Sequence, residues 1–432
     1  MKAQVLILFL FVAVGTSNAQ KLSNTEKKLI QAVERNSESQ LDFLEKVVNI
    51  NSGTENHKGV KQVGDLFKAE YDQIGFDTKW IDMSVTNRAG HLFAEKKGSK
   101  GKRILLIGHL DTVFEEASPF QTFQIQGDSI AFGPGVNDMK GGDVIMLYAL
   151  KALTDAGLLK DAQIIAAYTG DEESTGKPLE ISRKDLIEAA KRSDIALGFE
   201  TSTGFAYATT ARRGSSGWKV EVTGKRAHSA GIFNENVGAG AIFEISRILN
   251  AFYTEVKGEE YLTFNPGMIL GGSTVEHYPS LSKGEAFGKS NVVAQTATVT
   301  GGLRFISEEQ KERTREKMRA IVANNLPQTS ATITFTDSYP AMPPTPGNEA
   351  LLAKLSQVSL DLGQGPVSAW DPGRRGAADL SFVAEYVDGL DGLGTMGSGA
   401  HTLNETVNLE TMEALTKRIA VFLYRLINES SN

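Results

Sequence analysis

Short apolar runs that stop at glycine and acidic side chains constrain this sequence more than any other feature. Residues 104–107 lead into the sequence HLD, and residues 164–168 lead into GDEE. Between them lies a glycine-rich stretch, residues 133–143, which reads GPGVNDMKGGD. Aliphatic runs that end in this way are typical of buried parallel strands whose carboxyl ends carry a site. The pattern predicts strand ends that present imidazole and carboxylate groups together, as a metal cage.

Strand-like and helix-like patterns alternate through the first half of the chain. The predicted strands are residues 76–81, 91–95, 103–109, 162–169 and 194–200. The predicted helices are residues 23–48, 59–74, 139–156 and 178–192, the first opened by a capping box at Ser23 and Glu26. Such alternation predicts an α/β fold with a doubly wound sheet.

The pattern changes near Arg212. Predicted strands at 217–224, 292–305 and 331–337 are separated by predicted helices at 236–249 and 308–325, the second capped by Ser307. This order suggests an inserted ferredoxin-like α+β module. The expected organisation is a catalytic domain in two parts, residues 20–212 and 329–432, with the insert at 213–328. Helices at 349–362, 377–384 and 409–426 are expected in the last part, and residues 271–289 are expected as loop.

Composition narrows the functional classes. The chain of 432 residues is long enough for two domains, and its net charge of −7 favours neither nucleic acid nor an anionic membrane surface as a partner. It contains no cysteine. Disulfides and thiolate ligands are therefore excluded, so a metal must be bound by His, Asp and Glu.

The N-terminus has the pattern of a secretory signal. Lys2 precedes an apolar run at 5–14, and Ser17-Asn18-Ala19 provides small residues before a predicted cleavage at Gln20. The alternative, a membrane anchor, needs about 20 apolar residues. We expect residues 1–19 to be a cleaved signal peptide and the protein to be secreted or periplasmic.

Individually, the chemical motifs allow a functional or a purely structural interpretation. His109 and Asp111 point the same way on a strand, so both can bind Zn²⁺, or the carboxylate can orient the imidazole. Asp138 lies in a glycine-rich turn, where its carboxylate could approach two metals. Alternatively, the glycines of this turn only form a tight loop. Glu172 and Glu173 would repel each other unless a cation lay between them, or they belong to a turn in which water solvates their charges.

Glu200 ends another apolar run, and His401 lies in a further glycine-rich loop. His228 is a loop histidine of the insert, a type of residue that is usually only exposed surface. His57, His91 and His277 match no motif, and we expect them to be structural.

Together the motifs resemble one family. GHLDTV, GPGVNDMKGG, TGDEES, GFE, GKRAHSA and GSGAHTLNE occur in the order and spacing of the di-zinc exopeptidases and aminoacylases. That family includes glutamate carboxypeptidase, which this sequence resembles most, succinyl-diaminopimelate desuccinylase and peptidase T. The resemblance spans nearly the whole mature chain. It implies a phosphorylase/hydrolase-like catalytic domain with an inserted dimerisation domain.

The resemblance also implies roles for the motif residues. His109 and Glu200 would bind one zinc ion, Glu173 and His401 the other, and Asp138 would bridge the two. Asp111 would orient His109, Glu172 would be the general base, and the Asp138–Met139 peptide bond would be cis.

Further residues of this sequence match substrate-contacting positions of the family. Asn291 and Arg304 would contact the carboxylate end of the substrate, and so would Arg374 or Arg375, where the spacing leaves the choice open. His228 would stabilise the oxyanion in the active site of the opposite subunit, which requires a homodimer formed through the insert.

The predicted function is a secreted, zinc-dependent carboxypeptidase that releases a C-terminal amino acid, such as glutamate, from a peptide or N-acyl amino acid. Two alternatives remain at this point: an aminoacylase or dipeptidase on the same scaffold, and a non-catalytic binding homologue. Zn²⁺, Co²⁺ and Mn²⁺ all accept such ligands.

Overall fold

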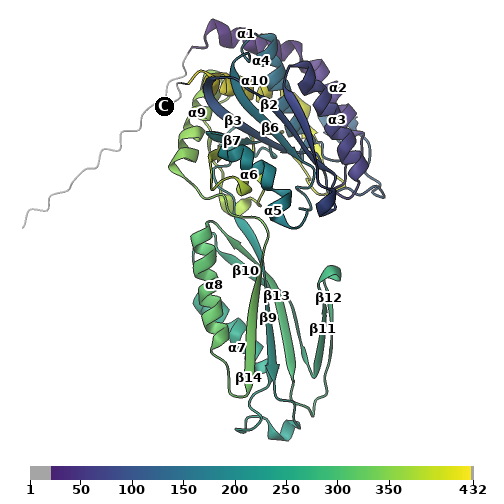
Figure 1. Cartoon of the computed structure of the whole chain (residues 1–432), viewed down its shortest axis with the longest axis vertical. Helices are drawn as coiled ribbons and strands as arrows, with labels where there is room; N and C mark the ends of the chain where they lie inside the picture. The colour runs from purple at the N-terminus through teal and green to yellow at the C-terminus, as the bar shows by residue number, and fades with distance from the viewer. Residues whose placement is uncertain (1–20, 430–432) are drawn as a thin grey trace, which may run out of the picture.

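The computed structural model of the chain describes residues 21–429, so the predicted signal peptide lies outside the described residues. A larger domain carries both described ends of the chain, and a smaller elongated domain extends from it (Figure 1). None of the helices within the described residues combines the length and apolar character that crossing a membrane requires.

The larger domain is built on a six-stranded sheet in the order β1-β2-β6-β3-β7-β16. In that order the strands are β1 (Asp77–Asp82), β2 (Gly90–Lys96), β6 (Ala162–Thr169), β3 (Lys100–His109), β7 (Ile195–Gly198) and β16 (Asp388–Leu390). The four strands from β6 to β16 are parallel, and β1 and β2 are antiparallel to their neighbours. The carboxyl ends of β3, β6 and β7 therefore meet at one edge of the sheet.

Helices cover both faces of this sheet, as the alternation along β3 shows. Ile104 and Leu106 pack into one hydrophobic core, and Leu105 and Ile107 pack into another. The first core contains α1 (Asn24–Arg35), α2 (Ser37–Val48), α3 (His57–Gln73), α4 (Lys140–Asp155), α9 (Pro346–Asp361) and α10 (Leu409–Ile427). The second contains α6 (Lys184–Lys191), which follows the short α5 (Leu179–Ser182). The expected doubly wound fold is confirmed.

The smaller domain has the expected ferredoxin-like order. Its antiparallel sheet runs β10-β13-β9-β14, with both helices in the chain positions that this fold requires. Its elements are β9 (Gly214–Gly224), α7 (Ala241–Ala251), β10 (Thr263–Gly272), β13 (Thr296–Phe305), α8 (Glu308–Ala323) and β14 (Thr329–Asp337). Trp218, Val220, Ile248 and Leu303 belong to its separate hydrophobic core.

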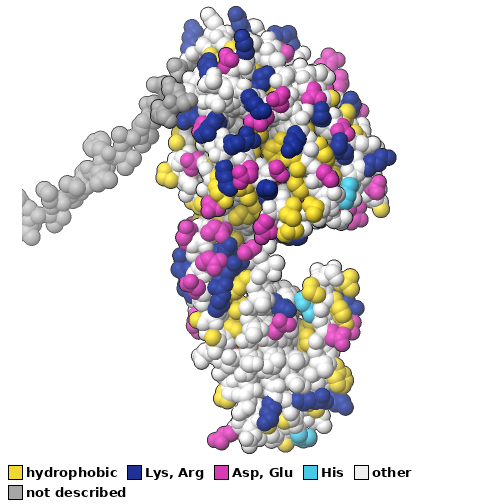
Figure 2. Space-filling view, in the orientation of Figure 1, with side chains coloured by type: hydrophobic (Ala, Val, Ile, Leu, Met, Phe, Trp, Pro, Cys, Tyr) yellow, Lys and Arg dark blue, Asp and Glu magenta, His cyan; other side chains and the backbone are white. Residues whose placement is uncertain are grey.

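Residues 271–289, expected as loop, instead contain an antiparallel hairpin of β11 (Thr274–Tyr278) and β12 (Lys283–Phe287). The hairpin stands beside the sheet, and Figure 2 shows an open gap between this side of the small domain and the large domain. The two domains are joined on the other side of this gap, at a hinge formed by residues 209–215 and 339–342.

A small antiparallel sheet brings the two glycine-rich loops together. It has the order β17-β18-β5-β4 and is formed by β17 (Gly397–Ser398), β18 (Thr406–Asn408), β5 (Ile130–Phe132) and β4 (Gln124–Gln126). His401 lies between β17 and β18, and residues 133–139 follow β5. Because β18 pairs with β5, loops that are distant in sequence become neighbours. The remaining short strands, β8 (Tyr207–Ala208) and β15 (Ser368–Ala369), pair in parallel.

Two predicted helices are each broken into two. The first breaks at Asn36, whose side chain donates to Asp155 (2.7 Å). The helix predicted at 178–192 breaks at Arg183, whose guanidinium turns inward to Asp171 and Asp379. These breaks follow from tertiary contacts, which local sequence patterns do not reveal.

Three further expectations were wrong. The helix predicted at 236–249 begins only at Ala241, because Gly238 and Gly240 have φ angles of 71° and 77°. Residues 377–384 form only a 3₁₀ turn at Asp379–Phe382. The expected domain boundary at residue 328 is too early, since β14 pairs with β9 and belongs to the insert.

Candidate metal centre

Five of the predicted ligands lie together as two groups of three that share Asp138. His109, Asp138 and Glu200 form one group, and Asp138, Glu173 and His401 form the other, with the ligand atoms of each within 4.8 Å of one another. His109 Nε2 is 3.5 Å from Asp138 Oδ1, and His401 Nε2 is 3.1 Å from Asp138 Oδ2. Each carboxylate oxygen of Asp138 thus faces a different imidazole, which is the geometry of a bridging ligand.

The backbone of Asp111 orients the His109 ring. His109 Nδ1 lies 3.0 Å from the carbonyl oxygen of Asp111, and the Asp111 carboxylate is further away, at 3.5 Å. A carbonyl oxygen can only accept, so Nδ1 carries a proton, and in the neutral ring the lone pair belongs to Nε2, which faces Asp138 and Glu200. This tautomer suits a metal ligand. From the sequence, the Asp111 side chain was expected to orient His109. In the structure, the backbone carbonyl group of Asp111 makes the shorter contact with the ring.

The Asp111 carboxylate instead holds the acidic loop after β6. Its two oxygens accept the backbone N–H groups of Glu172 (3.0 Å) and Glu173 (3.1 Å), and Thr54 donates to it at 2.6 Å. Glu173 is thereby directed at His401, with 3.1 Å between Oε2 and Nε2. Thr54 was not foreseen, because no local pattern distinguishes it.

The glycine-rich loop is held by Glu405. Its carboxylate accepts the backbone N–H groups of Gly135 (3.3 Å), Asn137 (2.8 Å) and Asp138 (2.9 Å). The Asp138–Met139 peptide bond is cis, as the resemblance implied. A side chain at Gly142 would clash with the carbonyl oxygen of Phe199, so this glycine permits close packing of α4 against the end of β7. No role was assigned to Glu405 from the sequence. Its place in the GSGAHTLNE motif was the one feature of the sequence that could have indicated such a role.

The electrostatics of the cluster call for cations. Burial, followed by the nearby charge of Asp138, raises the pKa of Glu200 to about 7. Burial also raises the pKa of Glu172 and of Glu173 above their usual range. Hydrogen bonds to Asp138 and Glu173 raise the pKa of His401 to about 11. Protons therefore neutralise the charge of the bare cluster, and bound cations would take their place.

Unpaired buried atoms point to the same conclusion. Within the residues described, His109 Nε2 and Glu173 Oε1 are buried without a hydrogen-bond partner. Buried polar atoms normally have partners, so these two are suited to a ligand that the protein chain does not supply. Imidazole and carboxylate donors fit Zn²⁺, Co²⁺ or Mn²⁺. The residues present thus fit two divalent metal ions.

The two candidate arginines differ in position. Arg375 Nη2 donates to the carbonyl oxygen of Thr201 (2.9 Å), next to Glu200, and its Nε is buried without a partner among the described residues. Burial, and then the charge of Arg212, lowers the pKa of Arg375 to about 10. Arg374 instead is exposed and stacks on Trp370, with 4.7 Å from its guanidinium carbon to the ring centroid. Of the two, Arg375 borders the cluster.

His228 and Asn291 are not brought to the cluster within one chain. They are neighbours, since Ser229 N–H donates to the Asn291 carbonyl oxygen (2.9 Å). Both lie beyond the end of β9 that is remote from the hinge. A strand of 11 residues spans about 36 Å. Arg304, by contrast, pairs with Ser215 near the hinge.

Buried ion pairs surround the site, and the sequence did not reveal them. Arg212 donates to Asp391 (2.7 Å), and Arg183 donates to Asp171 (2.6 Å) and Asp379 (2.9 Å). His91 was expected to be structural, and its position agrees with that expectation. Its ring is buried, accepts the Gly170 N–H and donates to the Ser182 carbonyl oxygen.

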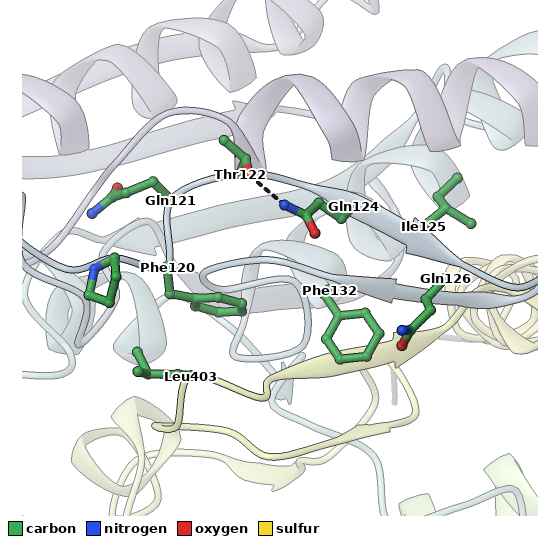
Figure 3. A pocket seen from close by; sticks show the side chains of 9 residues that line it. Phe120, Gln121, Thr122, Gln124, Ile125, Gln126, Phe132 and Leu403 are labelled. Atoms are coloured by element: carbon green, nitrogen blue, oxygen red, sulfur yellow. Dashed lines mark hydrogen bonds between the residues drawn. The ribbon is translucent and has the colours of Figure 1, made fainter.

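A hollow of about 440 Å³ lies beside the loop that carries His401. Figure 3 shows Phe120, Phe132 and Leu403 around it, together with three glutamine side chains. None of the clustered metal-ligand residues lines this hollow, so it is separate from the metal centre.

Comparisons with known proteins agree with this geometry. Residues 105–425 match the model of peptidase family M20/M25/M40. Carboxypeptidase G2 of Pseudomonas sp. (strain RS-16) is 28% identical over 400 residues, covering 91% of this chain and 89% of that protein. Succinyl-diaminopimelate desuccinylase of Gluconacetobacter diazotrophicus is 25% identical over 367 residues, covering 82% and 89%. The crystal structure of aminopeptidase PepT from Bacillus cereus has the same fold, with a TM-score of 0.71, 18% identity and coverage of 91% and 99%.

The doubly wound domain, the insert and the clustered ligands are those of a metal-dependent hydrolase. The chain belongs to peptidase family M20/M25/M40 and is a metal-dependent amidohydrolase.

Proposed function

We propose that this protein is a secreted two-zinc carboxypeptidase that releases a C-terminal amino acid with an acidic side chain, such as glutamate. The substrate would be a short peptide or an N-acyl amino acid. The single observation that carries the proposal is the position of Asp138 in both groups of ligands. Glu172 lies near the same cluster, since the charges of His109 and Glu200 act on its pKa.

In this proposal, His109 and Glu200 hold one zinc ion, Glu173 and His401 hold the other, and Asp138 bridges them. When bound, two such ions supply an activated water and polarise the scissile carbonyl group. Glu172 accepts the proton of the attacking water and delivers it to the leaving amine. Burial, which raises the pKa of Glu172, favours this exchange because it stabilises the protonated form.

One cationic side chain next to the cluster and a pair of cations near the hinge support an anionic substrate. Arg375 has a buried, unpaired Nε beside Glu200, and a guanidinium group can bind a carboxylate through two parallel hydrogen bonds. Burial and the charge of Arg213 lower the pKa of Arg304 near the hinge, so these two cations are close. A second carboxylate on the substrate would relieve that repulsion, which favours an acidic side chain.

The second candidate function is an aminoacylase or dipeptidase on the same scaffold. The similarity to succinyl-diaminopimelate desuccinylase favours it, because that name describes removal of an acyl group from an amine. The two functions share the chemistry of the metal centre and differ in the group that the side-chain pocket selects.

We further propose that the protein is a homodimer assembled through the insert, in which His228 and Asn291 serve the partner's active site. Their distance from the cluster in one chain supports this. Exposed apolar side chains also support it: Ile242 and Phe243 on α7 and Ile269 on the edge strand β10 are about half exposed. Such a surface is typical of a protein–protein interface.

Secretion is proposed from the sequence of residues 1–19 alone. The pattern of a basic residue, an apolar run and Ser17-Asn18-Ala19 supports cleavage before Gln20. The N-terminal sequence of protein recovered outside the cytoplasm tests this: Gln20 is expected as the first residue, and an uncleaved Met1 contradicts it.

Activity measurements test the function. Purified protein is expected to contain two zinc ions per chain and to release glutamate from an N-acyl glutamate, more readily than leucine from the matching N-acyl leucine. A chelator abolishes the activity and added Zn²⁺ restores it. Glu172→Gln keeps the metal and lowers kcat by about 10²- to 10⁴-fold. Full activity of metal-free protein would refute the proposal, and preference for the leucine substrate would refute its substrate class.

A further inference from the structure

Tyr339 lies where the chain leaves the insert and re-enters the large domain. Its carbonyl oxygen accepts the backbone N–H of Ser215 (2.8 Å), at the start of β9. Further along the hinge, Arg212 and Met342 exchange both backbone hydrogen bonds (2.9 and 3.0 Å). The two hinge segments therefore form a short antiparallel pair, and the backbone of Tyr339 belongs to it.

The side chain of Tyr339 reaches from the hinge into the acidic loop of the large domain. Its hydroxyl group donates to the backbone carbonyl oxygen of Glu172 and lies 2.8 Å from the hydroxyl oxygen of Thr175. A carbonyl oxygen only accepts, so the phenolic proton is used there and Thr175 is the donor in the second bond. The ring packs on Phe382, with 5.0 Å between centroids.

The peptide group that joins Glu172 to Glu173 is consequently held at both edges. Its carbonyl oxygen accepts from Tyr339, and its N–H donates to Asp111 (3.1 Å). Asp111 comes from the end of β3, whereas Tyr339 comes from the hinge. A peptide group held on both sides fixes the directions of the two side chains that flank it.

We propose that Tyr339 is a positioning residue that couples the orientation of the insert to the Glu172–Glu173 peptide. The inference rests on the proposed function, in which Glu172 is the general base and Glu173 a metal ligand. Rotation of the insert about the hinge displaces the phenol. The acidic loop keeps its catalytic geometry only in those orientations that preserve the hydrogen bond to Glu172.

Tyr339→Phe tests the coupling, because it removes the hydroxyl group and keeps the ring against Phe382. We expect kcat to fall about tenfold or more while KM changes less than about threefold, since the lost bond orients the base and does not bind substrate. Hydrogen–deuterium exchange in the segment 171–176 should become faster. Thr175→Val, which removes the donor to Tyr339, should produce smaller changes in the same direction.

Tyr386→Phe is the matched control, because Tyr386 is an exposed tyrosine of the large domain, and it should alter neither kcat nor exchange. Unchanged kcat and exchange in Tyr339→Phe overturn the proposal. So does a lower Tm with unchanged kcat, since that indicates a purely structural role. If the wild-type protein hydrolyses no amide substrate, the proposed function fails, and the exchange measurement alone then decides whether Tyr339 holds the loop.

Discussion

At the scale of single residues, Asp138 shows how much of the site depends on backbone placement. Its two oxygens face two imidazoles, and its own N–H is held by Glu405 from a loop 267 residues away in sequence. The five clustered ligands could be assigned from the sequence only through the family resemblance, because each motif alone also allows a purely structural interpretation. The roles of Thr54 and Tyr339 could not be predicted, because their partners are distant in the chain and neither residue belongs to a motif. Glu405 belongs to a motif, but its contacts with the glycine-rich loop could not be predicted.

The pair of adjacent arginines allows a sharp test at this scale. Arg375→Gln is expected to raise KM for an N-acyl glutamate by about ten- to a hundredfold, because a hydrogen bond to a charged group contributes about 1.5–3 kcal/mol. Arg374→Gln, which only loses stacking on Trp370, should leave KM within about twofold. Steady-state kinetics of both variants check this. A larger effect at Arg374 would show that the wrong arginine has been assigned to the substrate.

At the scale of elements, helix ends depend on side chains that single-sequence periodicity does not register. Two helix starts were predicted from the sequence: the capping box of Ser23 and Glu26 opens α1, and Ser307 caps α8. The break at Arg183 was not, since the amphipathic pattern continues through it while buried Asp171 and Asp379 draw the guanidinium inward. An ion pair of the core thus overrides a local helical preference.

The anchoring of α8 leads to a prediction about pH. The hydrogen bond from Arg313 lowers the pKa of Glu259 from 4.5 to about 2. Because the folded state favours the ionised form, this stabilisation is complete above about pH 4.5 and disappears as the pH falls through 2. Glu259→Gln should lower Tm by about 1–3 °C at pH 7 and progressively less below pH 4.5.

Thermal unfolding over a pH series measures the effect on α8. Glu316→Gln, an exposed change on the same helix, is the control and should leave Tm unchanged. A deficit in Glu259→Gln that persists undiminished at pH 2 would contradict the assigned cause.

At the scale of the whole molecule, the insert separates residues that the resemblance assigns to one active site. His228 and Asn291 lie beyond the far end of β9, whereas the metal ligands lie in the large domain. A second copy of the chain can supply the missing groups, and the exposed apolar residues of α7 and β10 offer a surface for it. The dimer stays a prediction.

Mixed dimers test this arrangement directly. His228→Ala and Glu172→Gln should each be nearly inactive alone, because each removes one group from every site. In a heterodimer of the two, one site regains both groups. Random association of equal amounts should therefore recover about a quarter of the wild-type activity. No recovery, in a mixture shown to exchange subunits, would mean that His228 does not act across the interface.

The sequence by itself determined the two-domain α/β organisation, the order of the motifs and the residue types available to bind metal, because hydrophobic periodicity and strand-end chemistry are local properties. Only the tertiary structure decided which atoms face one another. It showed that the Asp111 carboxylate holds the acidic loop, that Arg375 rather than Arg374 borders the cluster, and that Tyr339 reaches Glu172. The physical reason is that these contacts join segments far apart in the chain, and packing alone sets their distances.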